Sequence, residues 1–441
     1  NRYPAIDLIE SLSNNKQIVV TDVIEEDGKK RSVVNEQETV AAQDKAELLK
    51  QRFKDWIWQD ESRRARLLRF YNDHFNSVVT RKYNGSHLTL PGSNPAIKLR
   101  PSQKDAIWRI IQTGNTLLAH VVGSGKTYTM IGAAMEKRRL GLHQKPLFVV
   151  PNHLMRQFKA DFLRLYPAAN LLIADERNFH TDRRKQFMSR ISTGNWDAVV
   201  ITHSSFGLLQ VSPQTKERFI GEQIQRLRDF KESLPKRSST VKQIEKAVLR
   251  LEEKLEEILD QSKKDPGTSF EELGIDALFV DEADEFKNLA YQTKMEKVAG
   301  LGSKEGNDKT QDLLMKIQYL HGINDGAGVV FATGTPIANT MAEAYTMMRY
   351  LQPSLLQEKG LEHFDSWANA FGEVVARLEV NATGGGYKIN NRFSRFINVP
   401  ELMSMLREVW DIQTAEMLET AGVLVRGRDL PVTKGGKPDA V

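Results

Sequence analysis

Short runs of apolar residues recur through the middle of the chain, and each is followed by a turn and then by a helical pattern. Continuous apolar runs of this kind are typical of parallel strands that are covered on both faces. Strands that alternate with helices predict a doubly wound α/β domain, in which ligands bind beyond the carboxyl ends of the strands. The predicted strands are Thr116–Val121, Leu147–Val150, Leu171–Ala174, Ala198–Ile201, Ala277–Val280 and Val329–Ala332.

Residues 211–272 interrupt this alternation with a purely helical pattern. Apolar residues recur there in the manner of a coiled-coil seam, and the positions between them are mostly Lys, Glu and Arg. A seam of about two heptads is too short to hold a dimer alone, so we predict an antiparallel hairpin within one chain rather than an intermolecular coiled coil. The seam positions are Ile220, Ile224, Leu227 and Leu234 before Pro235, and Val241, Ile244, Val248, Leu251, Leu255 and Ile258 after it.

Residues 1–95 are expected to form an accessory region that precedes the α/β lobe, which we place at residues 96–352. Residues 17–34 have the alternation and the turn of a β-hairpin. Helical patterns follow at 38–58 and 60–75, and the second is rich in Arg. Those arginines are expected either to meet phosphates or, more simply, to form a solvated helix face.

Residues 353–441 are predicted to form a helical extension that ends in a linker towards a further lobe. The pattern is helical to about Ala376, and another helix is predicted near Pro400–Glu419. A polar, Gly-rich turn and a basic stretch separate the two helices. The turn is residues 381–386, and the basic positions are Lys388, Arg392 and Arg395.

Composition narrows the class of protein. With 40% hydrophobic and 27% charged residues, the 441-residue chain is neither fibrous nor wholly disordered. The net charge of +5 permits a nucleic-acid partner without demanding one. The absence of cysteine excludes disulfides, iron–sulfur clusters and thiol catalysis, and no apolar run is long enough to span a membrane. We therefore expect a cytoplasmic protein, and, since the chain begins with Asn1, a processed or partial one.

The residues Gly123-Ser124-Gly125-Lys126-Thr127 lie between a predicted strand and a predicted helix, which is the setting of a phosphate-binding loop. Glycines let backbone N–H groups converge on phosphate oxygens, and the helix N-terminus adds positive potential. Lys126 is expected to reach the β- and γ-phosphates of ATP, and the Thr127 hydroxyl to hold Mg²⁺. The strict motif begins with Gly where this chain has His120, so the match is incomplete, and a simple strand-to-helix turn is the alternative.

A second candidate segment, Asp281-Glu282-Ala283-Asp284, ends the predicted strand at 277–280. Its carboxylates are expected at the same edge of the sheet as the phosphate-binding loop. Asp281 is predicted to hold Mg²⁺ through its water shell, and Glu282 to polarise the water that attacks ATP. An acidic strand end alone is often only a helix cap, but together with the loop it indicates a nucleotide triphosphatase.

A third segment, Thr333-Gly334-Thr335, follows the last predicted strand. Small hydroxyl residues in this position are able to hydrogen-bond the acidic segment and so relay which nucleotide is bound. We assign these residues a coupling role, although a Thr-Gly-Thr-Pro sequence is also an ordinary turn.

In this order the three segments resemble the first RecA-like lobe of superfamily II helicases, and several details are similar to Swi/Snf-type translocases. The details are Asp281–Asn288, which has Asp284 where that family usually has His, and Thr333–Asn339. The resemblance implies that Gln103, in the sequence Leu99-Arg100-Pro101-Ser102-Gln103, contacts adenine. It also implies that two further segments bind the phosphates of double-stranded DNA, through Pro151, Asn152, Thr202 and His203.

A narrower resemblance is to the helicase part of large bacterial, plasmid and phage proteins that join such a motor to a DNA methyltransferase. No methyltransferase motif is visible in this chain. Superfamily II motors have a second RecA-like lobe whose arginines complete the ATP site, and no sequence of that kind follows Asn339. The resemblance therefore implies one lobe of a DNA-dependent ATPase, in a prokaryotic or phage setting concerned with restriction, modification or mobile elements.

Two other functions stay open. The literal Asp-Glu-Ala-Asp sequence also occurs in RNA-directed ATPases, although their third motif is Ser-Ala-Thr and this chain has Thr-Gly-Thr. A nucleotide- or DNA-binding module without turnover is the other alternative, because the second lobe is not visible.

Overall fold

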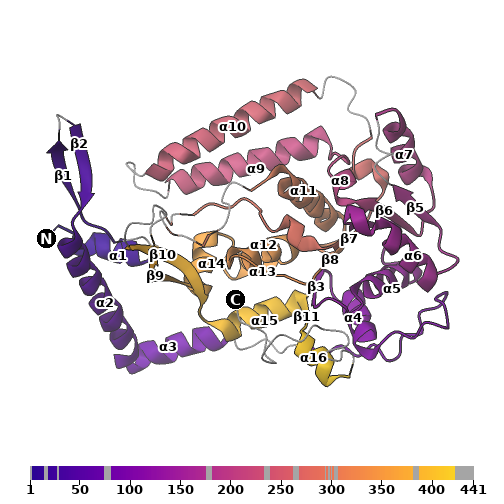
Figure 1. Cartoon of the computed structure of the whole chain (residues 1–441), viewed down its shortest axis with the longest axis horizontal. Coiled ribbons are helices and arrows are strands. Elements are labelled where there is room, and N and C mark those ends of the chain that lie inside the picture. The colour runs from indigo at the N-terminus through magenta and orange to yellow at the C-terminus, as the bar shows by residue number, and fades with distance from the viewer. Residues whose placement is uncertain are drawn as a thin grey trace.

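A computed structural model of the chain describes residues 2–13, 18–26, 29–73, 81–174, 181–232, 239–261, 268–293, 295, 298, 300–301, 306–380 and 387–422. At its centre is a parallel β-sheet with helices on both faces (Figure 1). A small N-terminal region and a helical hairpin lie at the periphery. Among the described residues, no helix has the length and apolar character needed to cross a bilayer.

Seven strands form the central sheet in the order β11-β3-β8-β7-β4-β6-β5, and every neighbouring pair is parallel. Every residue of five of these strands, β3, β4, β6, β7 and β8, is buried, as expected of strands covered on both faces. All six predicted strands are present, with ends within one residue of the predicted positions. They are β3 (Thr116–His120), β4 (Pro146–Val150), β5 (Leu171–Ala174), β6 (Ala198–Thr202), β7 (Ala277–Asp281) and β8 (Val329–Thr333).

Alternate side chains of the strands enter two separate cores, one on each face of the sheet. Leu147 and Val149 of β4 belong to the larger core, and Phe148 and Val150 belong to the smaller one. The smaller core packs against α4 (Pro101–Gln112), α5 (Lys126–Arg139) and α6 (Met155–Leu165). The larger core packs against α7 (Thr181–Thr193), α8 (His203–Phe206), α11 (Asp308–Ile323), α12 (Ala342–Leu351), α13 (Pro353–Glu358) and α14 (Phe364–Phe371). The predicted doubly wound α/β fold of RecA type is confirmed.

The helical hairpin consists of α9 (Pro213–Glu232) and α10 (Ser239–Gln261), which lie side by side (Figure 1). Leu227 and Ile244 are buried between them. Ion pairs join Arg228 to Glu252 (2.7 Å) and Lys231 to Glu245 (2.8 Å), so the two helices run in opposite directions. The helices thus pair within one chain, as predicted; Leu234 and Pro235 lie outside the described residues.

The N-terminal region contains α1 (Ala5–Ser13), β1 (Thr21–Glu26), β2 (Lys29–Val34), α2 (Glu36–Gln59) and α3 (Glu61–Tyr71). β1 and β2 pair antiparallel, as the sequence predicts. Leu8, Val20 and Ala42 contribute to a small separate core between α1 and α2. The Arg-rich α3 buries none of its residues, which agrees with a solvated helix face.

The C-terminal region differs from the helical prediction. β9 (Gly372–Val380) and β10 (Tyr387–Phe396) pair antiparallel, so the helix predicted to reach Ala376 ends at Phe371 with α14. The helix predicted near Pro400–Glu419 is divided into α15 (Val399–Val409), β11 (Trp410–Gln413) and α16 (Ala415–Thr420). β11 is a strand because it pairs with the open edge of β3, a tertiary contact that local helical periodicity does not register.

The predicted domain boundaries stay predictions, but the central sheet takes a strand from beyond residue 352. The Gly-rich turn at 381–386 and the last dozen residues, which are predicted as a linker, lie outside the described residues. The predicted basic positions Lys388, Arg392 and Arg395 all lie on β10.

Candidate nucleotide-binding site

Three adjacent strands bring the three predicted segments together. β3, β8 and β7 are neighbours in the sheet, and the carboxyl end of each carries one segment. The phosphate-binding loop follows β3, the acidic segment begins at the last residue of β7, and Thr333 ends β8. Residues that are far apart in the sequence therefore lie at one edge of the sheet, where doubly wound folds bind ligands.

The loop between β3 and α5 turns at two glycines in a left-handed conformation. Gly123 and Gly125 both have φ of +86°, a left-handed conformation that strains other residues. A Cβ atom on Gly125 would lie 2.4 Å from Nε2 of Gln103, so a larger residue there would displace the Gln103 amide. Ser124 Oγ is buried and has no hydrogen-bond partner within the described part of the chain. The loop thus leaves polar groups available for a ligand.

Arg100 and Gln103 support this loop from the start of α4. The Arg100 guanidinium donates to the carbonyls of Gly123 (3.2 Å) and Ser124 (3.3 Å). Gln103 is buried; its amide accepts from the Arg100 N–H (2.9 Å) and donates to the Gly125 carbonyl (3.1 Å). The contact of Gln103 with adenine stays a prediction. The support of the loop by Arg100 was not predicted. The one feature of the sequence that indicates it is the position of Arg100 directly before Pro101, at the start of a helix.

Lys126 and the acidic residues form the charged part of the site. Lys126 Nζ donates to the carbonyl of His120 (3.0 Å), and its positive charge acts on both Asp281 and Glu282. Burial nevertheless raises the pKa of Asp281 and of Glu282 above their usual values, because desolvation outweighs the attraction of Lys126. Two carboxyl groups with raised pKa beside a lysine are typical of a functional site rather than of a structural ion pair.

The backbone at Glu282 is strained. Its φ is +49° and its ψ is 54°, a left-handed conformation that costs a non-glycine residue about 1–2 kcal/mol. The Asp281 carboxylate accepts a hydrogen bond from the Glu282 N–H (3.1 Å). Strain of this kind persists where the surrounding structure imposes it, and it is concentrated at functional sites.

Asp284 joins the acidic segment to the Thr-Gly-Thr segment. Its carboxylate accepts hydrogen bonds from the hydroxyls of Thr333 (2.9 Å) and Thr335 (3.3 Å). Gly334 lies between them, close to Lys126 Nζ. The contact on which the predicted coupling depends is therefore present, and it uses the residue at which the chain departs from the family's usual His.

Glu343 is a second connection between the same segments, and the sequence did not single it out. Its carboxylate is 3% exposed and accepts from the backbone N–H groups of Ala338 (2.7 Å), Asn339 and Thr340. Lys287 Nζ lies 3.5 Å from the same carboxylate. The loop after Thr335 is thus fixed to the helical turn that follows the acidic segment.

The predicted nucleic-acid residues lie at the ends of two neighbouring strands, β4 and β6. Pro151 and Asn152 follow β4, and the Asn152 amide donates to Ser204 Oγ (3.0 Å). Thr202 ends β6 and caps α8 by accepting from the Ser205 N–H. The two segments therefore lie side by side, and their contact with DNA stays a prediction.

His203 differs from the other three. Its Nε2 lies 2.8 Å from the backbone carbonyl of Asp281, and since a carbonyl only accepts, Nε2 carries the hydrogen. Burial lowers the pKa of His203 to about 4, so the imidazole is neutral near pH 7. A neutral ring that faces β7 offers no positive charge to a phosphate.

The residues fit a magnesium–nucleotide ligand. Among the described residues there is no group of three or more His, Cys, Asp or Glu that could hold a metal ion. Mg²⁺ in nucleotide sites requires no such group, because phosphate oxygens and waters provide most of its ligands. A half-buried Thr127 on α5 and the carboxylate of Asp281 are the donors that this chemistry requires.

Comparisons with known proteins match most of the chain. A family described as a probable helicase domain matches residues 108–414, and a domain of unknown function matches residues 1–77. The defense against restriction protein B of Escherichia phage P1 is 24% identical in an alignment of 418 residues that covers 84% of this chain and 18% of the phage protein. The chain thus spans less than a fifth of the length of that curated relative.

Among solved structures, the SWI2/SNF2 ATPase core of Sulfolobus solfataricus in complex with double-stranded DNA is 15% identical. The match has a TM-score of 0.35 and covers 64% of this chain and 41% of the archaeal chain. The family match alone covers well over half of the sequence, and it confirms the helicase resemblance of the motifs. The chain therefore belongs to the family of probable helicase domains.

Proposed function

We propose that this chain is the ATP-binding lobe of a DNA-dependent, Swi/Snf-type motor. The observation that carries the proposal is the convergence of Lys126, Asp281 and Asp284 at one edge of the sheet, with Asp284 hydrogen-bonded to Thr333. This arrangement supports nucleotide hydrolysis, and it supports the transmission of the nucleotide state from the acidic segment to the Thr-Gly-Thr segment.

In this proposal, the backbone N–H groups of residues 123–127 and the N-terminus of α5 bind the phosphates of ATP. The Lys126 ammonium exchanges the carbonyl of His120 for the β- and γ-phosphates. Thr127 and Asp281 hold Mg²⁺, which neutralises phosphate charge when it is bound.

Glu282 orients and polarises the attacking water. The raised pKa of its carboxyl makes it a stronger base than an ordinary glutamate. Loss of the γ-phosphate then alters the acidic segment, and Asp284 transmits that change to Thr333 and Thr335.

We further propose that double-stranded DNA is the polymer on which the motor acts and that Pro151, Asn152 and Thr202 contribute phosphate contacts. The family match and the grouping of these residues support this assignment. The name of the phage relative supports a role in restriction, modification or resistance to restriction.

Completion of the ATP site is assigned to a second RecA-like lobe, because the residues assigned to ATP all lie at one edge of a single sheet. An arginine supplied from the other side accounts for roughly 10³–10⁵ in rate in related phosphoryl-transfer sites. A methyltransferase partner is a further possibility within the same proposal.

The test is steady-state phosphate release at saturating ATP and Mg²⁺, without polymer, with duplex DNA and with duplex RNA, with Lys126→Ala as the blank. It is carried out on this chain and on the full-length protein. DNA-stimulated turnover in the full-length protein, with ATP binding but little turnover in this chain, is the expected result. Stimulation by RNA alone supports an RNA-directed ATPase instead, and ATP binding without turnover in either protein supports a non-catalytic binding module.

A further inference from the structure

His120 is the residue at which the loop departs from the strict phosphate-binding motif, and the structure gives it a partner. The side chain is almost fully buried, and its Nε2 lies 2.9 Å from the carboxylate of Asp411 on β11. A glycine at this position would have no such contact. The departure from the motif therefore coincides with a connection to a strand that lies 291 positions further along the chain.

The same strand is bonded to the loop through the backbone. β11 pairs with β3 in parallel register, with Gln413 opposite His120. The Gln413 carbonyl accepts from the N–H of Val121 (3.0 Å), which is the first residue after β3. Both the last residue of β3 and the first residue of the loop are thus fixed to β11.

Asp411 is in turn fixed by a buried arginine. Arg109 Nη1 lies 3.9 Å from the Asp411 carboxylate, and Nη2 donates to the Arg407 carbonyl on α15. The side chain of Arg109 is 7% exposed and that of Asp411 is 22% exposed, so water reaches the pair only from the Asp411 side. Asp411 therefore receives one partner from α4 and one from the end of β3.

The position of His120 also determines where Lys126 lies. The carbonyl of His120 accepts the hydrogen bond of Lys126 Nζ (3.0 Å), and Gly334 is close to both groups. A shift of His120 would move the acceptor that holds the lysine beside the phosphate site.

We propose that His120 and Asp411 are positioning residues that make the conformation of the phosphate-binding loop depend on the docking of β11. The inference rests on the proposed function, because the ligand of the loop is ATP there. It goes further by assigning the control of the loop to residues 399–413, which lie outside the three segments assigned to the ATP site. Nucleotide binding and β11 docking then stabilise each other, since coupling between two sites is reciprocal.

The first test needs no nucleotide. Amide hydrogen exchange of residues 121–126 is measured in the ligand-free chain for wild type, Asp411→Ala and His120→Ala. The matched control is Gln413→Ala, which changes the same strand but retains the backbone bond to Val121. We expect exchange of the loop to be about tenfold faster in both test variants and unchanged in the control. Equal loop exchange in all four proteins would overturn the proposal, whether or not the chain binds ATP.

The second test measures ATP–Mg²⁺ affinity and the exchange of residues 410–413 with and without nucleotide. We expect Asp411→Ala and His120→Ala each to weaken binding roughly 5- to 50-fold, within the usual range of coupling between sites. The double variant should bind no more weakly than the worse single variant, because one connection is lost in each case. Bound nucleotide should slow exchange in β11 of the wild type only.

The outcomes separate the two proposals. Lower thermal stability of the variants with unchanged loop exchange and unchanged nucleotide affinity would reduce the pair to a structural contact. Failure of the wild type to bind ATP would refute the proposed function, while the first test would still decide whether β11 controls the loop.

Discussion

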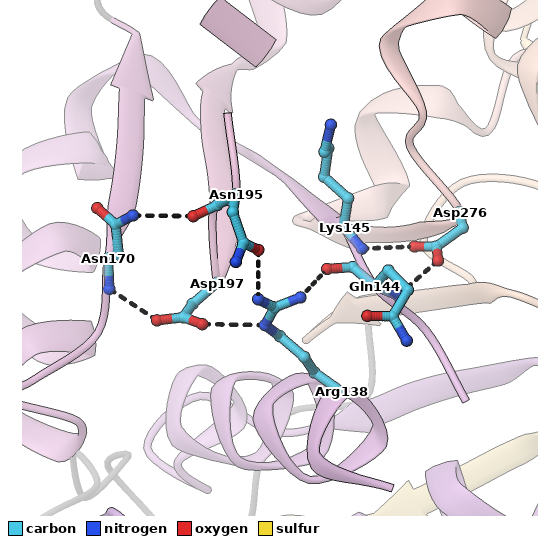
Figure 2. A network of polar contacts seen from close by, with 7 residues as sticks. All are labelled: Arg138, Gln144, Lys145, Asn170, Asn195, Asp197 and Asp276. Carbon is cyan, nitrogen blue, oxygen red and sulfur yellow. Dashed lines mark hydrogen bonds and ion pairs between the residues drawn. The ribbon is translucent and has the colours of Figure 1, made fainter. Parts of the chain in front are cut away.

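The polar side chains at the two ends of the central sheet differ in how fully they are hydrogen-bonded. At the amino ends of four adjacent strands, Asp197 precedes β6 and Asp276 precedes β7, and both oxygens of each carboxylate accept hydrogen bonds. Figure 2 shows the guanidinium of Arg138 joined to Asp197, to Asn195 and to the Gln144 carbonyl. At this end of the sheet, each oxygen of the two carboxylates therefore has a hydrogen-bond donor.

The partners in this network come mostly from the backbone just before the strands. Asp197 accepts from the Asn170 N–H (2.8 Å), directly before β5, and Asp276 accepts from the Lys145 N–H (2.9 Å), directly before β4. Each carboxylate therefore fixes the start of one strand to the start of another (Figure 2). All four carboxylate oxygens are therefore bonded, in a network that is partly exposed to water, since Gln144, Asn170 and Asn195 are exposed.

At the carboxyl ends of the strands, polar groups are buried without equivalent compensation. The pKa values of Asp281 and Glu282 are raised by burial, Ser124 Oγ has no partner among the described residues, and Glu282 is strained. We infer that the hydrogen bonds at the amino ends of the strands stabilise the fold, while the polar groups at the carboxyl ends remain available for a ligand. Substitutions at the two ends should therefore affect different measurements.

The largest effect should come from Lys126→Ala. Loss of the ammonium removes the charge that meets the transferring phosphate, so turnover of the full-length protein should fall by about 10³-fold or more. Phosphate release and the melting temperature are measured together, so that any loss of stability from removing the positive charge beside Asp281 and Glu282 is separated from the loss of turnover. Normal turnover would remove the basis for the phosphate-binding loop.

A smaller loss of turnover should follow from Glu282→Gln, which retains the size of the side chain and removes the charge that polarises water. Turnover should fall by roughly 10²–10⁴, the range of general-base catalysis, while ATP affinity stays within a few-fold of the wild type. Binding is measured with a fluorescent ATP analogue and hydrolysis by phosphate release. A parallel loss of both would show that Glu282 holds the nucleotide instead.

At the opposite end, Asp197→Ala should reduce stability and leave nucleotide affinity unchanged. The substitution removes an acceptor from the Arg138 guanidinium and from the Asn170 N–H, which water also reaches, so it should cost about 1–2 kcal/mol of unfolding free energy. Urea unfolding measures the loss, and ATP affinity measured on the folded protein is the control. A change in affinity as large as that of Lys126→Ala would contradict the division of roles.

Much of the central sheet and of the candidate site could be predicted from the sequence. The six strands and the edge at which Lys126, Asp281 and Thr333 meet follow from apolar runs and from the segments at their ends. These features are local in the chain, and parallel topology then brings the segments together.

What could not be predicted depends on contacts between distant residues. β11 is a strand because β3 has an open edge, and Glu343 matters because a loop of backbone N–H groups lies against it. The environment of His203 depends on β7, which is adjacent only in space. Periodicity and motif spacing carry no information on such contacts, so each of these residues was either missed or assigned incompletely.

The smallest effect should be a gain in stability from Asp281→Asn. Burial raises the pKa of Asp281 in the folded protein, so the ionised carboxylate is a cost to folding at neutral pH, and the neutral amide removes that cost. Stabilising substitutions at functional sites typically contribute about 0.5–2 kcal/mol, with loss of activity.

The gain should depend on pH. Because the pKa of Asp281 in the folded protein lies above its pKa in the unfolded chain, the cost of the ionised carboxylate is fully present above the folded-state pKa. It disappears as the pH falls to the unfolded value of about 3.9. The advantage of Asn over Asp in urea unfolding should therefore be largest near pH 7 and should shrink towards pH 4. A less stable variant at pH 7 would show that the attraction of Lys126 outweighs desolvation, and that the ligand end of the sheet is as well compensated as the structural end.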